Sequence, residues 1–299
     1  MKKNFNYVRI FFRIFLIIAI LFSSQILASS KNDDHYLILT FSKKYYFNQL
    51  NTYEKEIYLN LLNSKDKFIN NEKIYCIELD YENQFETYSN YLEKSIYAYI
   101  FDNPESTLWL WTQNYRFSYE TVNGTNYLYI APDTDSNAYT DFSNEELDSR
   151  INAVEKLTSD FVTSLSGTNK EKYLKINNWI LQNSEYAEDL VENDLAYTSN
   201  NLYSALIDKS TICSGFSFAF KYICDLANLP CIYLTGFDSV KTYHAWNVVF
   251  VDDQWKVIDL TLNLGREKAS FISLSSCPYT VGMFDGAEFS FSYPSLITS

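Results

Sequence analysis

Apolar residues recur at helical spacing in two stretches of the first half of the chain. Residues 46–62 place apolar side chains on one face, and Asn51 with Glu54 forms a capping box within this stretch. A second helix is expected over residues 88–103, because Pro104 cannot continue it.

Between and after these helices, β-branched and aromatic residues predict strands. The predicted strands are Lys73–Leu79, Thr107–Val122 and Asn126–Pro132. The last two flank Asn123-Gly124, the dipeptide most typical of a two-residue hairpin turn. The first half of the chain therefore reads as a mixed α+β region.

The helical pattern returns at residue 143. Ser143 and Glu146 cap a long helix that should end at Gly167, and Thr168 with Glu171 caps the next one. A polar loop is expected to follow, up to about residue 200.

Composition turns polar and loop-like near residue 135, which indicates a domain boundary near residue 140. We therefore expect an N-terminal α+β region over residues 31–140 and a second domain over residues 141–299.

The first 30 residues have the layout of a secretory signal peptide. The apolar run Ile14–Phe22 is 9 residues long, too short for a spanning helix, and is followed by the small residues Ala28, Ser29 and Ser30. The basic residues of the leader are Lys2, Lys3, Arg9 and Arg13. We expect cleavage after Ala28 or Ser30, a secreted or cell-surface protein, and no membrane span in the mature chain; an uncleaved anchor is the alternative.

The chain is acidic, with 24 basic and 37 acidic residues and a net charge of −13. Removal of the four basic leader residues leaves 20 basic residues and a net charge of −17. Such a surface repels nucleic acid and anionic membranes, so neither is expected as a partner.

Five cysteines in an exported chain leave at least one free thiol. The other four allow three disulfide pairings, or all can be reduced and buried. There is no Cys-Xaa-Xaa-Cys pair and there are only two histidines, so we expect neither a metal site nor a cofactor.

Cys213 is the cysteine with a chemical context. A loop over residues 208–212 precedes it, and Phe216, Phe220 and Ile223 follow at helical spacing. Cys213 should therefore lie at a helix N-terminus, where unpaired N–H groups and the helix dipole favour a thiolate.

A predicted hairpin brings His244 and Asp259 together. Residues 244–251 and 254–261 read as strands joined by a turn at Asp252-Asp253, so residues whose numbers sum to about 505 should face each other. His244 and Asp259 sum to 503, which makes them near-opposite or diagonal neighbours.

A thiol at a helix N-terminus with a histidine and an aspartate on paired strands is the arrangement of nucleophilic thiol catalysis. His244 would take the Cys213 proton, and Asp259 would hold the imidazole in the required tautomer. Trp246 would pack beside them and exclude water. Each residue taken alone has an ordinary structural role as a core or capping residue; the order and spacing of all three favour the catalytic interpretation.

These residues and their spacing resemble the transglutaminase-like superfamily, most closely its bacterial secreted or surface members, which include cysteine-protease-type domains. The matching elements are Cys213 with Gly215, His244–Asn247, and Trp255 with Asp259. The resemblance implies an α+β, papain-like fold in which the cysteine helix packs on an antiparallel sheet. It also implies that Cys213 is the nucleophile, His244 the acid/base and Asp259 the orienting residue.

Two positions depart from the bacterial pattern. Phe216 stands where a tyrosine is usual, and Thr261-Leu262-Asn263 replaces Thr-Trp-Asp. The Cys213 backbone N–H is a natural oxyanion donor, and the second donor is unassigned, with Tyr197 or Ser199 as candidates.

The expected function is a secreted or cell-surface thiol enzyme that cleaves amide bonds of peptides or proteins through a thioester. Water as acceptor makes it a peptidase or amidase, and a lysine amine makes it a cross-linking transglutaminase. Hydrolysis is slightly favoured because no sequence feature marks a desolvated amine channel. The alternative is a catalytically silent binding or scaffold domain with the same fold.

Overall fold

The computed structural model of this chain describes residues 31–79, 85–110, 115–132, 143–193, 196–284, 287 and 289–292. Contacts within the chain separate the stretch up to Ile38 from a second unit, Leu39–Ser299. The described part of the first stretch is the start of helix α2 (Lys31–Lys43), which continues into the second unit. The predicted signal peptide, residues 1–30, lies outside the described residues.

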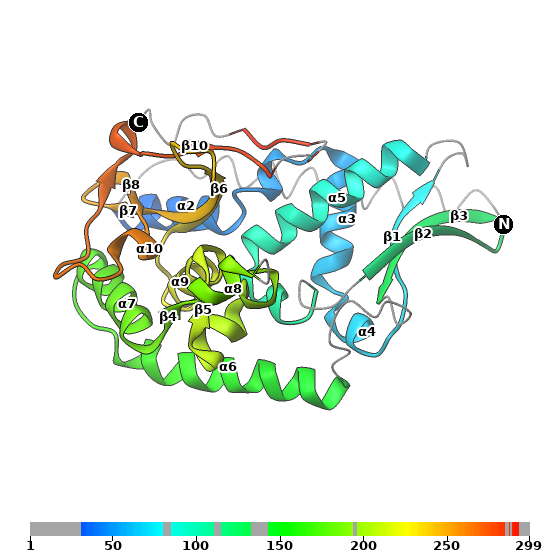
Figure 1. Cartoon of the computed structure of the whole chain (residues 1–299). Helices are drawn as coiled ribbons and strands as arrows, with labels where there is room; N and C mark the ends of the chain where they lie inside the picture. The colour runs from blue at the N-terminus through cyan, green and yellow to red at the C-terminus, as the bar shows by residue number, and fades with distance from the viewer. Residues whose placement is uncertain are drawn as a thin grey trace. The chain divides into compact units, whose positions relative to one another are not determined.

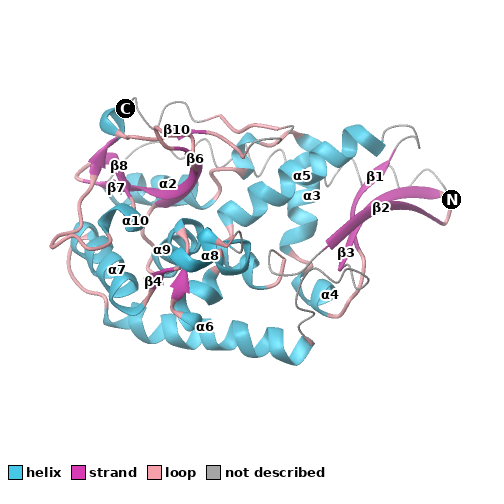
Figure 2. Ribbon diagram, in the orientation of Figure 1, coloured by secondary structure: helices cyan, strands magenta, loops and turns pink. Residues whose placement is uncertain are grey.

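The first half of the second unit combines helices with a three-stranded antiparallel sheet (Figures 1 and 2). The strands are β1 (Ile74–Leu79), β2 (Tyr115–Val122) and β3 (Thr125–Pro132), in the order β1-β3-β2. The helices are η1 (Phe47–Gln49), α3 (Thr52–Leu62), α4 (Lys65–Ile69), α5 (Phe85–Asp102) and η3 (Pro104–Leu108).

Local sequence explains where these elements begin and end. The predicted capping box of Asn51 and Glu54 is present at the start of α3. Asn123 and Gly124 join β2 to β3 with φ of 53° and 81°, the left-handed conformation that a type I′ hairpin turn requires. Helix α5 ends at Asp102, two residues before Pro104, as predicted.

The second half begins with two long helices, and a five-stranded antiparallel sheet follows (Figure 1). Its helices are α6 (Asn144–Ser164), α7 (Asn169–Asn183), α8 (Glu188–Glu192), η4 (Ala196–Ser199), η5 (Ser204–Asp208), α9 (Cys213–Leu226), α10 (Leu260–Asn263) and η6 (Leu274–Ser276). Its strands are β4 (Glu185–Tyr186), β5 (Ser210–Thr211), β6 (Cys231–Phe237), β7 (Tyr243–Val251), β8 (Gln254–Ile258), β9 (Ile272–Ser273) and β10 (Thr280–Val281).

The large sheet has the strand order β10-β6-β7-β8-β9. In the β7–β8 hairpin Val251 pairs with Gln254, so facing residues sum to 505 and the predicted register is confirmed. Asp252 and Asp253 form the turn with φ of 55° and 59°. Helix α9 packs against β6 and β7, which confirms the expected α+β core of a cysteine helix on an antiparallel sheet.

Aromatic stacking fastens α9 to this sheet and to the N-terminal half. Phe218 of α9 lies parallel to Tyr233 of β6, with ring centroids 4.1 Å apart. Phe101 of α5 lies 4.9 Å from the same tyrosine ring. Residues from both halves of the chain thus contribute to one buried core.

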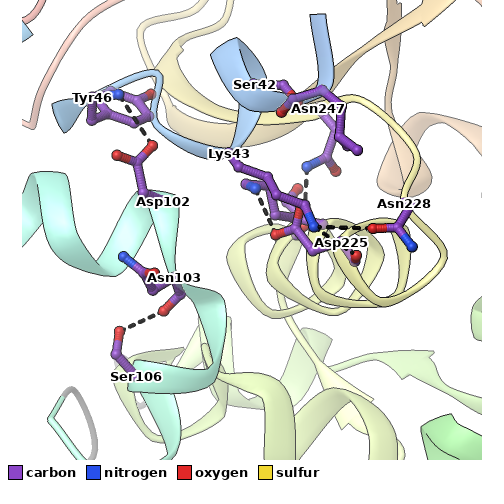
Figure 3. A network of polar contacts seen from close by, with 12 residues as sticks. Ser42, Lys43, Tyr46, Asp102, Asn103, Ser106, Asp225, Asn228 and Asn247 are labelled. Atoms are coloured by element: carbon purple, nitrogen blue, oxygen red, sulfur yellow. Dashed lines mark hydrogen bonds and ion pairs between the residues drawn. The ribbon is translucent and has the colours of Figure 1, made fainter. Parts of the chain in front are cut away.

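Polar contacts join α5 to the start of η1 and form within α9 (Figure 3). Asp102, at the end of α5, accepts hydrogen bonds from the backbone N–H groups of Tyr46 at 3.1 Å and Phe47 at 2.8 Å. Within α9, buried Lys221 is paired with Asp225 at 2.6 Å. Burial raises the pKa of Asp102 to about 7, against the opposing effect of its two backbone hydrogen bonds.

Three expectations for the strands and loops were wrong in part. The predicted strand from Thr107 starts later, because Thr107 and Leu108 belong to the 3₁₀ helix that Pro104 begins, and β2 starts at Tyr115. Strand β8 ends at Ile258, because Asp259 leaves the sheet to cap α10. The predicted polar loop before residue 200 contains β4 and α8.

The predicted domain boundary near residue 140 lies outside the described residues, and the division into two domains stays a prediction. No helix in the described part of the chain is both long enough and apolar enough to cross a bilayer.

Candidate active site

Cys213 is the first residue of α9, as its sequence context predicted. The residue before it, Ile212, has an extended backbone and no side-chain cap, so the first turn of the helix has no side chain folded over its N–H groups. Cys213 is 8% exposed. The thiol therefore lies at the positive end of a helix and is nearly buried.

Hydrogen bonds hold the chain just before Cys213 in place. Thr211 donates its hydroxyl to the Ser199 carbonyl oxygen at 2.7 Å and lies 3.1 Å from the Ser204 hydroxyl. The Ile212 N–H also donates to the Ser199 carbonyl oxygen, at 3.1 Å. Residues 211 and 212, just before Cys213, are thus held by hydrogen bonds to Ser199.

Gly215 permits this close packing. A Cβ atom on Gly215 would lie 1.9 Å from the Thr211 hydroxyl oxygen and 3.2 Å from the Asn201 carbonyl oxygen. The glycine two residues after the cysteine is therefore required by space, since its own backbone conformation is an ordinary helical one.

The helix that carries Cys213 is bonded to the strand that carries His244. Asn247 of β7 is fully buried and donates its amide to the Ser217 carbonyl oxygen of α9 at 3.0 Å (Figure 3). Asn247 lies three positions after His244 on the same strand. The His-Ala-Trp-Asn sequence thus contains both the imidazole and the side chain that sets its distance from the helix.

His244 and Asp259 are in direct contact, as the hairpin register predicted. The Nε2 atom of His244 lies 2.9 Å from Oδ2 of Asp259. The other carboxylate oxygen, Oδ1, accepts a hydrogen bond from the Leu262 N–H at 3.1 Å and so caps α10. Asp259 is 1% exposed and His244 is 15% exposed, so the pair is open to solvent only on the imidazole side.

The Cys213 thiol is the second partner of the imidazole. Burial lowers the pKa of His244, but hydrogen bonds with Asp259 and with Cys213, and the charges on both, outweigh it and raise this pKa to about 10. Because Nε2 faces Asp259, Nδ1 is the ring nitrogen left for the thiol. The structure thus brings together all three predicted site residues.

Four aromatic side chains surround these groups, and only Trp246 was anticipated. Trp246 is fully buried, with its ring centroid 6.1 Å from His244 and 4.6 Å from Tyr279. Tyr186 and Tyr243 are near enough to Cys213 for its charge to act on their hydroxyls. Burial, and to a lesser extent this charge, raises the pKa of both to about 12.

Tyr279 is the residue that sequence reasoning missed. Its hydroxyl donates to Oδ2 of Asp259, the oxygen that also contacts His244, and its ring lies 4.8 Å from the imidazole. Tyr279 stands 20 residues after Asp259. Nothing in its local sequence marks it, since a tyrosine is common in this chain.

Of the two candidates for a second oxyanion donor, the structure describes only the Ser199 side chain, and Tyr197 stays a prediction. The Ser199 hydroxyl donates to the Ser210 carbonyl oxygen and is therefore occupied in the loop before Cys213. The side chain of Tyr197 lies outside the described residues.

Of the two alternatives for the cysteines, disulfide pairing or reduced thiols, the structure has the reduced form. All five cysteines are free thiols, with Cys76, Cys224 and Cys231 buried and Cys277 half-buried. In the described residues, no three or more His, Cys, Asp or Glu side chains are grouped to hold a metal ion.

Residues 156–260 match the family model of the transglutaminase-like superfamily, and this stretch contains Cys213, His244 and Asp259. No curated protein matches the sequence.

Three solved structures share low similarity with the chain. A crystal structure of a TGase is 17% identical over 52% of this chain and 46% of that chain, with a TM-score of 0.36. A protein provisionally named a cysteine protease, from Cytophaga hutchinsonii, is 13% identical over 54% and 66% of the two chains, with a TM-score of 0.31. A protein provisionally named a protease, from Parabacteroides distasonis, is 13% identical over 56% and 41%, with a TM-score of 0.28.

This chain therefore covers at most 66% of the length of any of the three. The family match spans α7, the cysteine helix and the β7–β8 hairpin, the elements that carry the site. Through this match, residues 156–260 are assigned to the transglutaminase-like superfamily.

Proposed function

We propose that this protein is a thiol enzyme that acts on amide bonds of peptides or proteins. Cys213 is the nucleophile, His244 the acid/base and Asp259 the residue that orients the imidazole. One observation carries the proposal: His244 is bonded through Nε2 to a buried carboxylate, which directs its other nitrogen to a thiol at a helix N-terminus.

The reaction begins with proton transfer from Cys213 to His244, and the helix N-terminus and the imidazolium stabilise the thiolate. The thiolate adds to the amide carbonyl carbon, and the carbonyl oxygen takes the negative charge. Collapse of this intermediate breaks the C–N bond, and the imidazolium donates its proton to the departing amine. A thioester on Cys213 remains.

The second half of the reaction depends on the acceptor. With water, His244 removes a proton as the water oxygen attacks the thioester, and the product is a carboxylic acid. With a lysine amine, the same steps give a new amide and a cross-link. We favour hydrolysis, because the partly exposed imidazole gives water direct access to the thioester and no sequence feature marks a dry amine channel.

We also propose that the enzyme is exported and acts outside the cell or at its surface. The basic leader, its short apolar run and the small residues after it support this proposal. N-terminal sequencing of the protein recovered from outside producing cells would test it, with a new terminus after residue 28 or 30 expected.

The first test of the activity is the rate of iodoacetamide labelling against pH, with each labelled cysteine mapped by mass spectrometry. We expect Cys213 to label rapidly at pH 6–7, where an ordinary thiol with a pKa of about 8.5 is mostly protonated. Cys277 serves as an internal control, because it is half-buried and burial raises its pKa. Replacement of His244 by alanine should abolish the rapid labelling.

A matching activity test uses amide cleavage of peptide pools by the wild type and by Cys213→Ala. Cleavage that persists in the variant would contradict the thiol mechanism. A Cys213 that labels no faster than Cys277 would favour the alternative, a binding or scaffold domain that keeps the fold without turnover.

A further inference from the structure

We propose that Tyr279 is a positioning residue of this site, whose hydroxyl holds the Asp259 carboxylate against His244 and shares its negative charge. The role of Tyr279 in catalysis rests on the proposed function. It extends the site beyond residue 260, where the family match ends.

Tyr279 reaches the site because the chain crosses the sheet just before it. Strand β9 lies at one edge of the five-stranded sheet and β10 at the other, so residues 274–279, the crossing segment, traverse four strand spacings. That distance is about 19 Å. Seven residue steps from Ser273 to Thr280 reach at most about 25 Å when fully extended, and the 3₁₀ turn η6 shortens them further.

The crossing segment therefore has little slack, and it passes the end of the sheet where the site lies. His244 is the second residue of β7 and pairs with Gly236 near the end of β6, and Asp259 directly follows β8. Residues held at both ends of a short connection have few alternative positions. Tyr279 is thus fixed by the fold and not by its neighbours in sequence.

The end of the crossing segment is anchored to β6. The Gly282 N–H donates to the Thr235 carbonyl oxygen at 3.0 Å, and the Thr235 hydroxyl donates to the Gly282 carbonyl oxygen at 2.9 Å. A Cβ atom on Gly236 would lie 2.0 Å from the Thr280 carbonyl oxygen. The glycine in β6 thus permits the approach that brings Tyr279 over the carboxylate.

Three donors then hold Asp259. Leu262 N–H contacts Oδ1 at 3.1 Å, while His244 and the Tyr279 hydroxyl share Oδ2. The tyrosine ring packs against both the imidazole and Trp246, at centroid distances of 4.8 Å and 4.6 Å. A phenol that donates to a carboxylate makes a charge-assisted bond, which fixes its direction and disperses its charge.

The consequence is electrostatic as well as geometric. The other titratable groups near Asp259 and its partners are Cys213 of α9, Tyr186 of β4, Cys277 of the crossing segment and Asp238 after β6. The two side chains bonded to Oδ2 in the described part of the chain are those of His244 and Tyr279. Without the tyrosine hydroxyl, Asp259 presents more negative charge to the imidazole and to the thiolate, which favours the protonated form of both.

The test is the pH profile of Cys213 alkylation in the wild type and in Tyr279→Phe, which keeps the ring and removes only the hydroxyl. We expect both the acidic and the basic limb of the profile to move to higher pH, by about 0.5 or more. Tyr243→Phe is the matched control, because that phenol also lies near Cys213 but its hydrogen bond is with Thr235. Its profile should superimpose on that of the wild type.

A Tyr279→Phe profile identical to the wild type would overturn the proposal, since loss of the hydroxyl from a side chain that only fills space does not shift either limb of the pH profile. A second readout needs no activity. The chain has two histidines, so a His35→Gln background leaves His244 as the only imidazole seen by NMR. We expect its Nε2 proton signal to shift when Tyr279→Phe is added.

The two readouts separate failure of the inference from failure of the proposed function. If Cys213 of the wild type labels slowly below pH 7, the thiol mechanism fails. The NMR signal then decides the role of Tyr279: a shift supports the bond to Asp259, and an unchanged signal overturns it.

Discussion

Asn247 donates its buried amide to the Ser217 carbonyl oxygen at 3.0 Å, and this bond joins the strand of His244 to the helix of Cys213. Cys213 lies four residues before Ser217 on α9, and His244 lies three residues before Asn247 on β7. Both members of the proposed ion pair are therefore close to this bond and on rigid elements. The distance between imidazole and thiol is therefore set by packing of the helix on the sheet.

Replacement of Asn247 by alanine should leave the Ser217 carbonyl oxygen buried without this donor. We expect the free energy of unfolding in urea to fall by about 1–3 kcal/mol. The rate of Cys213 alkylation at pH 6–7 should fall as well, because the helix can shift relative to His244. Asn60→Ala is the matched control: its amide also donates to a backbone carbonyl oxygen, that of Cys76 at 2.8 Å, in the N-terminal half. That variant should lose stability and keep the alkylation rate.

Replacement of Gly215 by alanine should be destabilising although alanine favours helices. The added Cβ would lie 1.9 Å from the Thr211 hydroxyl oxygen, which is itself held by the Ser199 carbonyl oxygen. Overpacking of this kind costs about 1–3 kcal/mol, more than the gain of about 1 kcal/mol in helix propensity. Urea unfolding measures the difference. Gly282→Ala, whose Cβ would meet its nearest neighbour at 3.6 Å, should be tolerated; equal losses in the two variants would contradict this expectation.

The stability contributed by His244 should depend on pH in a defined window. Its pKa rises from 6.5 to about 10 on folding, so the folded state binds the proton more tightly. The contribution is therefore complete below pH 6.5 and is lost as pH rises through about 10. A tenfold change in proton affinity corresponds to about 1.4 kcal/mol in the free energy of unfolding.

Urea unfolding of the wild type and of His244→Gln, measured from pH 6 to pH 10, tests this window. The stability difference between them should shrink steadily as pH rises. In Cys213→Ala the stability difference should be lost at a lower pH, because hydrogen bonding and charge from Cys213 help to raise the pKa of His244. A difference that is constant with pH would show that the imidazole is not held as a cation.

Lys221 and Asp225 of α9 form an ion pair that should stabilise the fold only when both residues are present. Lys221 is 1% exposed and lies 2.6 Å from Asp225. Lys221→Met leaves the Asp225 carboxylate, whose side chain is 18% exposed, without this partner, and we expect a loss of up to about 3 kcal/mol in the free energy of unfolding. Adding Asp225→Asn should restore much of this loss.

A surface pair in the same chain provides the comparison. Lys256 lies 3.0 Å from Asp252, but the two side chains are 22% and 48% exposed. Lys256→Met should cost less than about 1 kcal/mol. Similar losses at Lys221 and Lys256 would mean that burial does not distinguish the two pairs.

Local rules predicted much of the site because each rule acts over a few residues. The capping boxes at Asn51, Ser143 and Thr168 all form, since a side chain there can reach only its own helix terminus. The turn at Asp252-Asp253 sets the register of β7 and β8, and with it the contact of His244 with Asp259. The predicted extension of this strand to Thr261 was wrong because the Asp259 side chain caps α10, which competes with strand pairing there.

The sequence by itself determined the position of Cys213 at a helix N-terminus and the pairing of His244 with Asp259, because both follow from the periodicity and turns of neighbouring residues. Only the tertiary structure decided that Asn247 joins helix to strand and that Tyr279 reaches Asp259. These contacts link residues 30 and 20 positions apart, and they depend on a strand order that no local sequence pattern predicts. Their partners are chosen by packing, which depends on the whole chain at once.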